Sequence, residues 1–181
     1  SILMATGTSL QEVGTPGDKS VQAGAAKKAI STSLETFIAE MRHMSDEHDK
    51  GDIDVAMPAD KFSGAYREMA EGVNSMVAGH ISVKKKAIAC FTQFGKGDFD
   101  AKLERFPGKK AFINDAIEEM RANLQRLSTD VDFLVDAAKN GQLDSRVDSN
   151  RHQGDFRKIV EGINTTLQTI IEPLQVVARN A

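Results

Sequence analysis

The chain has 181 residues, with 26 acidic residues against 23 lysines and arginines, so its formal net charge is −3. A nucleic-acid-binding domain needs a clustered basic face. The one dense basic run, Lys84-Lys85-Lys86, is interpreted as a solvated helix face, so we expect no nucleic-acid partner. The single cysteine, Cys90, cannot form an intramolecular disulfide. No stretch approaches the ~20 apolar residues of a membrane-spanning helix, so we expect no membrane contact by this segment itself.

Residues 1–26 are rich in glycine, serine and threonine and include the turn signal Gly14-Thr15-Pro16-Gly17-Asp18. Their glycines lack the spacing of a phosphate-binding loop. We therefore expect a linker, or the tail of an upstream module, over this whole range.

Apolar residues become regularly spaced from residue 30 onward, at alternating gaps of 4 and 3. This spacing predicts a helix with the narrow a/d seam of a coiled coil. Its members are Ile30, Leu34, Phe37, Met41, Met44 and His48. Gly51 ends the pattern, as a left-handed helix cap does.

An extended connector is predicted after Gly51, because Ile53, Val55 and Met57 alternate with polar or small residues before Pro58. A second helix is expected to begin near Ser63. Its seam runs without a break through Tyr66, Met69, Val73, Met76, His80, Val83, Ala87, Cys90 and Phe94. The same helix thus leaves one repeat and enters the next, and Cys90 is interpreted as a small buried seam residue.

The pattern of helix, glycine and connector then recurs twice. Gly97 ends the second helix, and the second connector is marked by Phe99, Leu103 and Phe106. The third seam consists of Ile113, Ile117, Met120, Leu124, Leu127, Val131, Leu134 and Ala138. Gly141 ends it, and Leu143 and Val147 mark the third connector. The last seam is Phe156, Ile159, Ile163, Leu167, Ile170, Leu174 and Val177, with a coiled-coil stutter near Ile163–Leu167.

These features define a repeat, because the three glycines lie 46 and 44 residues apart. We expect a linker over 1–26, repeats over 27–80, 81–127 and 128–170, and the start of a possible further repeat over 171–181. A repeat of ~45 residues is too small to bury a sizeable core alone. A partner chain is therefore expected to complete each core.

The repeats resemble HAMP domains, the signal-relay modules of bacterial receptors and sensor kinases. The family's connector glycine falls at Gly51, Gly97 and Gly141, and its apolar anchors fall at Ile53 with Val55 or Met57, Phe99 with Leu103, and Leu143 with Val147. The family's apolar-Asn pair in the second helix matches Val73-Asn74 and Ile163-Asn164, and Asn123-Leu124 approximates it. Segments 64–74 and 153–164 are similar to each other and to the tandem HAMP arrays of methyl-accepting chemotaxis proteins.

The resemblance implies an all-α parallel homodimer in which every repeat forms a four-helix bundle, two helices per chain. It also implies a relay of conformational signals from an upstream sensor to a downstream kinase-control module. The partners would be a chemotaxis histidine kinase and a coupling protein. The location would be the cytoplasmic portion of a receptor attached to the inner membrane.

Three other readings stay open at this point: a static dimeric spacer, the HAMP array of a sensor histidine kinase, and a ligand-binding helical sensor. We expect no enzyme, because no pair of carboxylates is positioned as an acid and a base. No cofactor or metal is expected either. His43 and His48 lie on different faces of a helix, and the aspartates near the glycines lack the ligand spacing of a calcium loop.

Overall fold

A computed structural model describes residues 16–181, and this part of the chain is helical, without a strand, which confirms the predicted all-α class. The four long helices are α1 (Pro16–Asp49), α2 (Gly64–Gly95), α3 (Phe112–Lys139) and α4 (Gly154–Asn180). None of the helices in the described residues is long and apolar enough to cross a membrane. Each connector holds one short 3-10 helix: η1 (Ala59–Lys61), η2 (Gly108–Ala111) and η3 (Ser149–Arg151).

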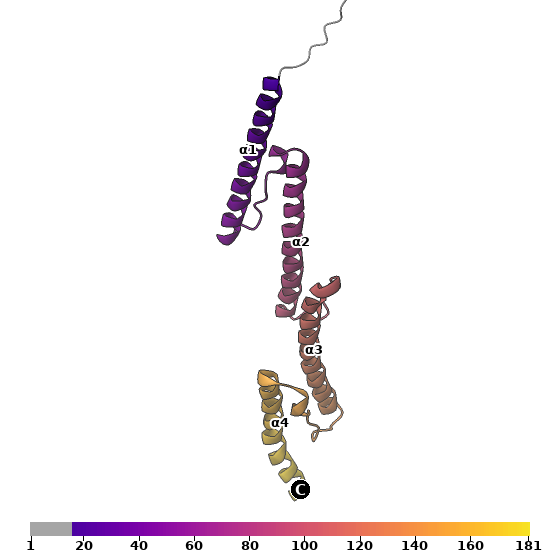
Figure 1. Cartoon of the computed structure of the whole chain (residues 1–181). Helices are drawn as coiled ribbons and strands as arrows, with labels where there is room; N and C mark the ends of the chain where they lie inside the picture. The colour runs from indigo at the N-terminus through magenta and orange to yellow at the C-terminus, as the bar shows by residue number, and fades with distance from the viewer. Residues whose placement is uncertain (1–15) are drawn as a thin grey trace, which may run out of the picture. The chain divides into compact units, whose positions relative to one another are not determined.

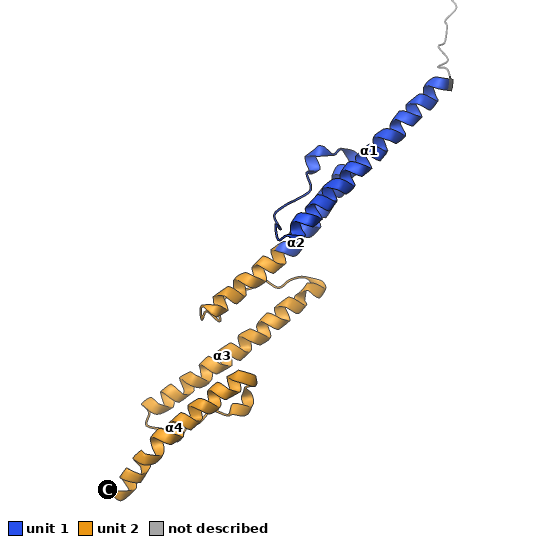
Figure 2. Cartoon of the chain, turned by 90° about the vertical axis from the view of Figure 1, so that its left-hand side faces the viewer, with its two compact units in different colours: residues 1–81 blue, residues 82–181 orange. Residues whose placement is uncertain are grey.

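Each connector runs back alongside the helix that has just ended, so that the next helix points in the same direction (Figure 1). We call residues 50–63, 96–111 and 140–153 the first, second and third connectors. The chain divides into two compact units, residues 1–81 and 82–181 (Figure 2). The division falls inside α2, which is one unbroken helix, as the continuous seam predicts.

The start of α1 differs from the expected linker over residues 1–26. Residues 16–26 are helical, and only residues 1–15 of that range lie outside the described chain. Pro16 is the first helical residue, a position that suits proline because its missing N–H has no partner there in any case. Asp18 adds a favourable negative charge to the first turn. Pro16, Gly17 and Asp18 of the predicted turn are therefore the beginning of a helix.

All three connectors begin with the same glycine cap. Gly51, Gly97 and Gly141 have φ values of 100°, 88° and 75°, in the left-handed region. At the second connector, the Gly97 N–H donates to the Phe94 carbonyl at 2.9 Å, and the Asp98 N–H donates to the Gln93 carbonyl at 3.0 Å. This pair of bonds is the Schellman motif, which satisfies carbonyls left free at the end of a helix.

The substitution Gly97→Val is expected to lower the free energy of unfolding by about 1–2 kcal/mol, because a β-branched residue is penalised at positive φ. Gly95→Val is the matched control, because Gly95 is helical and neither glycine has a heavy atom within 4 Å of an added Cβ. Urea denaturation at one protein concentration measures both. Equal midpoints for the two variants would contradict the left-handed cap.

The core of the first compact unit uses only half of the predicted α1 seam. Phe37 and Met44 are buried, and they pack with Met57, Phe62 and Ala70. The alternate seam residues of α1 and α2 lie on the surface of the chain; they are Leu34, Met41, Met69 and Met76. In the first compact unit the heptad seam is therefore split into residues that pack within the chain and residues that remain exposed.

In the second compact unit, a core cluster forms where α2 meets α3. Its buried members are Ala87, Cys90, Phe94 and Ile117, so the prediction that Cys90 is buried is confirmed. Farther along α3 the predicted seam is displaced by one residue. Asp130 and Ala137 are buried there, whereas Val131 and Ala138 are exposed. Apolar spacing could not reveal this, because a charged residue occupies the inward position.

Candidate functional site

The connectors carry the polar contacts that fix each helix pair, and the first and third are held alike. The side-chain amide of Asn74 accepts from the Met57 N–H at 2.8 Å and donates to the Met57 carbonyl at 2.8 Å. Asn164 makes the same two bonds to Val147, at 3.1 and 2.7 Å. We call this arrangement the amide clasp. It pairs both main-chain groups of one connector residue, which would otherwise be partly buried without partners.

The second connector lacks this clasp at the corresponding place. Asn114, which is 4% exposed, binds two different residues instead: its Oδ1 accepts from the Phe106 N–H and its Nδ2 donates to the Glu104 carbonyl, both at 2.8 Å. The expected Asn123 accepts from Arg126 at 2.9 Å. Ile113-Asn114 is also an apolar-Asn pair, so the same sequence motif could have identified Asn114.

Arg121, on α3, is the second polar residue that binds this connector, and the sequence did not predict it. Its Nη1 donates to the Phe99 carbonyl at 2.5 Å and its Nη2 donates to the Ala101 carbonyl at 2.6 Å. The guanidinium also lies 5.0 Å from the centre of the Phe94 ring. Glu118 binds it at 3.0 Å. Burial lowers the pKa of Arg121, but the hydrogen bond and charge of Glu118 outweigh burial and raise it, so this residue stays cationic.

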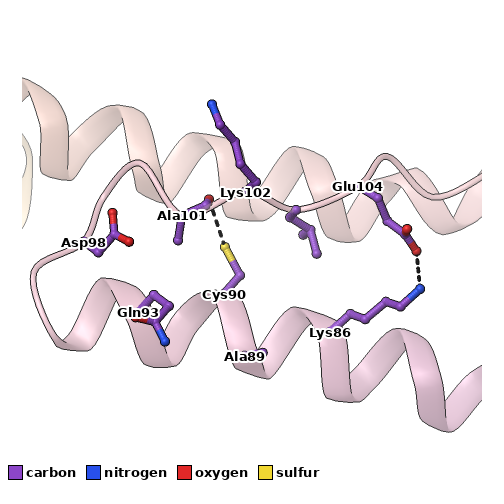
Figure 3. Close-up of a pocket in the computed structure, with 9 residues that line it drawn as sticks. Lys86, Ala89, Cys90, Gln93, Asp98, Ala101, Lys102 and Glu104 are labelled. Atoms are coloured by element: carbon purple, nitrogen blue, oxygen red, sulfur yellow. Dashed lines mark hydrogen bonds and ion pairs between the residues drawn. The ribbon is translucent and has the colours of Figure 1, made fainter.

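Cys90, on α2, faces the second connector beside an open hollow of about 520 Å³ (Figure 3). Its thiol points toward the connector and donates to the Ala101 carbonyl at 3.7 Å. Lys86 and Glu104 form an ion pair across the same hollow (Figure 3). The lining therefore ties the connector to α2.

A polar cluster of Asp130, Arg151 and His152 joins α3 to the third connector. The side chains of Asp130 and His152 are only 6% and 1% exposed, and Asp130 Oδ2 lies 2.6 Å from His152 Nε2. Arg151 donates to the other carboxylate oxygen at 2.7 Å. The carboxylate thus has a partner on each oxygen, as a buried charge requires.

The first connector has the same layout ninety residues earlier, with different chemistry. Lys61 pairs with Glu40 at 2.7 Å, in the places of Arg151 and Asp130. Phe62 occupies the position that corresponds to His152, and its ring packs edge-on against Phe37 with 5.6 Å between the ring centres. Both connectors therefore carry an ion pair, to which the first adds an aromatic contact and the third adds the buried hydrogen bond between His152 and Asp130.

The predicted site residues fall into two groups. Val147 is buried and Phe99 and Leu103 are half-buried against the helices, and Asn74 and Asn164 bind the connectors directly. Ile53 and Leu143 are instead 40% and 42% exposed, so they lie outside the core of the single chain. Within the described chain no group of three His, Cys, Asp or Glu side chains could hold a metal ion.

Three stretches of the chain match family models of the HAMP type. Residues 31–79 match the second HAMP domain of methyl-accepting chemotaxis protein McpB, residues 83–125 match HAMP N-terminal domain 3, and residues 151–180 match the HAMP domain. The chain is therefore a tandem array of HAMP domains. The first and last stretches contain the asparagines of the two amide clasps.

The chain is also similar to a curated relative, methyl-accepting chemotaxis protein McpB of Pseudomonas aeruginosa. The two are 36% identical over 124 residues, which is 68% of this chain. The matched part is 18% of the relative's length, so the likeness concerns one portion of a much longer protein.

Proposed function

We propose that the chain is the signal-relay segment of a bacterial chemoreceptor and works as a parallel homodimer. It would pass conformational signals from an upstream sensor to a downstream kinase-control module, in the cytoplasmic portion of the receptor. The partners would be a chemotaxis histidine kinase and a coupling protein. The likeness to McpB, whose name describes a methyl-accepting chemotaxis protein, supports this assignment.

The exposed half of the heptad seam carries the proposal of a dimer. Leu34 and Met41 are 45% and 41% exposed, and Met69 and Met76 are 49% and 61% exposed. They lie at a/d spacing on two parallel helices, the pattern that coiled-coil partners bury. A second copy, packed in parallel, would cover all four in a four-helix bundle.

The proposed modules follow the expected boundaries, with HAMP domains over 27–80, 81–127 and 128–170 and the start of a possible further one over 171–181. α2 would belong to the first two, and α3 to the second and third. A bundle with two packings of similar free energy biases its neighbour through such a shared helix, because the helix transmits rotation. The proposed signalling positions are the capping glycines, the connector anchors and the two clasp asparagines.

Cysteine cross-linking tests the parallel dimer. In a Cys90→Ala background, Leu34→Cys is expected to give a disulfide-linked dimer under mild oxidation, because equivalent seam residues meet across a parallel pair. Glu35→Cys is the control, since the next residue points ~100° away. Sedimentation equilibrium should give the mass of two chains. A single-chain mass across the micromolar range, with helicity retained, would contradict the proposed dimer.

A further inference from the structure

The second connector is the exception among the three. The first and third connectors are each held by an amide clasp, 23 residues after their glycines, whereas Met120 stands at that place after Gly97. The next position holds Arg121, where the other two repeats have Ser75 and Thr165, both exposed. The second connector is therefore held by a cation in addition to the two hydrogen bonds of Asn114.

The contacts of Arg121 reach three elements at once. Its guanidinium binds two carbonyls of the connector, a ring of α2 and a carboxylate of α3. The carbonyls of Phe99 and Ala101 both accept from this one side chain, as the planar fork of an arginine allows. The side chain is only 13% exposed, which strengthens these charge-assisted bonds.

We propose that Arg121 is a latch that fastens the second connector to α2 and α3 together, so that this connector can be released while the first and third stay docked. This role of the latch in signalling rests on the proposed relay, but the docking itself can be measured without any output module. Release would free Ala101 from Cys90 and would open the hollow beside the thiol (Figure 3).

The labelling rate of Cys90 by N-ethylmaleimide reports release in the whole chain, because Cys90 is the only cysteine and is 3% exposed. Arg121→Gln should raise this rate about tenfold or more, since it removes charge-assisted bonds. Arg121 Nη2 lies 3.9 Å from Cys90 Sγ, so the substitution also uncovers the thiol locally, and hydrogen exchange is needed to distinguish this from release of the whole connector. Arg121→Lys should give a smaller increase than Arg121→Gln. An ammonium keeps the positive charge but lacks the planar fork that fits both carbonyls.

Hydrogen exchange supplies the second measurement. The Phe106 amide, which Arg121 does not touch, should exchange about tenfold faster in Arg121→Gln if the latch governs the whole connector. The amides of Met57 and Val147, held by the clasps, should stay within about twofold. Arg105→Gln is the control, because that arginine is 71% exposed and lies on the same connector.

Two results would overturn the latch. One is unchanged labelling of Cys90 and unchanged exchange at Phe106 in Arg121→Gln. The other is an equal rise at all three connectors, which would make Arg121 a support of the whole array. Neither result depends on whether the chain relays a signal, so failure of the latch and failure of the proposed function remain distinguishable.

Discussion

One residue inserted between Gly79 and His80 is expected to abolish stimulus control of kinase output in the full-length protein. α2 runs unbroken from Gly64 to Gly95, so the insertion rotates everything downstream by ~100° relative to the upstream seam. Met69 and Met76 would then face a different direction from the seam residues after His80. A rotation of this size would misalign the two proposed bundles that share the helix, and the output should become locked or lost.

A four-residue insertion at the same place is the matched control. Four residues rotate the helix by only ~40° beyond a full turn, which coiled coils accommodate as a stutter. This variant should keep much of its response, measured as output-kinase activity with and without stimulus. Equal activity in the two variants would show that the junction is a passive tether, and the static spacer would then replace the relay.

The substitution His152→Ala is expected to lower the free energy of unfolding by about 3–5 kcal/mol, because it truncates a buried ring and removes a buried hydrogen bond to Asp130. His152 is one of two partners of the buried Asp130 carboxylate, and its removal also leaves a cavity. His152→Phe should cost less, because it restores the volume that Phe62 occupies in the first compact unit. Arg151→Ala should also cost less, since that side chain is 53% exposed.

Urea denaturation at one protein concentration, followed by circular dichroism, gives these differences. Lys158→Ala is a suitable control, because Lys158 is 81% exposed and its ion pair with Asp155 is on the surface. If His152→Ala is no more destabilising than Lys158→Ala, the cluster does not hold the third connector.

The helices could be predicted because long heptad seams and glycine caps are local signals. Gly97, for example, is identified by the end of one seam and confirmed by a φ of 88°. The start of α1 could not be placed, because glycine-rich composition masked the proline at its first position. The seam residues that remain exposed and those that pack within the chain have the same apolar character, so the sequence could not separate Phe37 from Leu34.

The polar contacts of the site were harder to predict, since they join residues far apart in the chain. Asp130 and His152 are 22 positions apart, and neither belongs to an apolar pattern. Arg121 resembles any exposed helix cation until the connector folds back over it. Asn74 and Asn164 were found only through a family motif, and Asn114 was missed because it precedes the expected place.

The amide clasp touches only main-chain atoms, and this leaves the connector free to diverge. Asn74 and Asn164 bind Met57 and Val147 alike, although the preceding residues are Asp-Val-Ala in one connector and Asp-Ser-Arg in the other. Substitutions there can change charge or size without disturbing the two bonds. Duplicated modules can therefore diverge in sequence while each connector stays docked in the same way. Selection can then change the outer surface of each module independently.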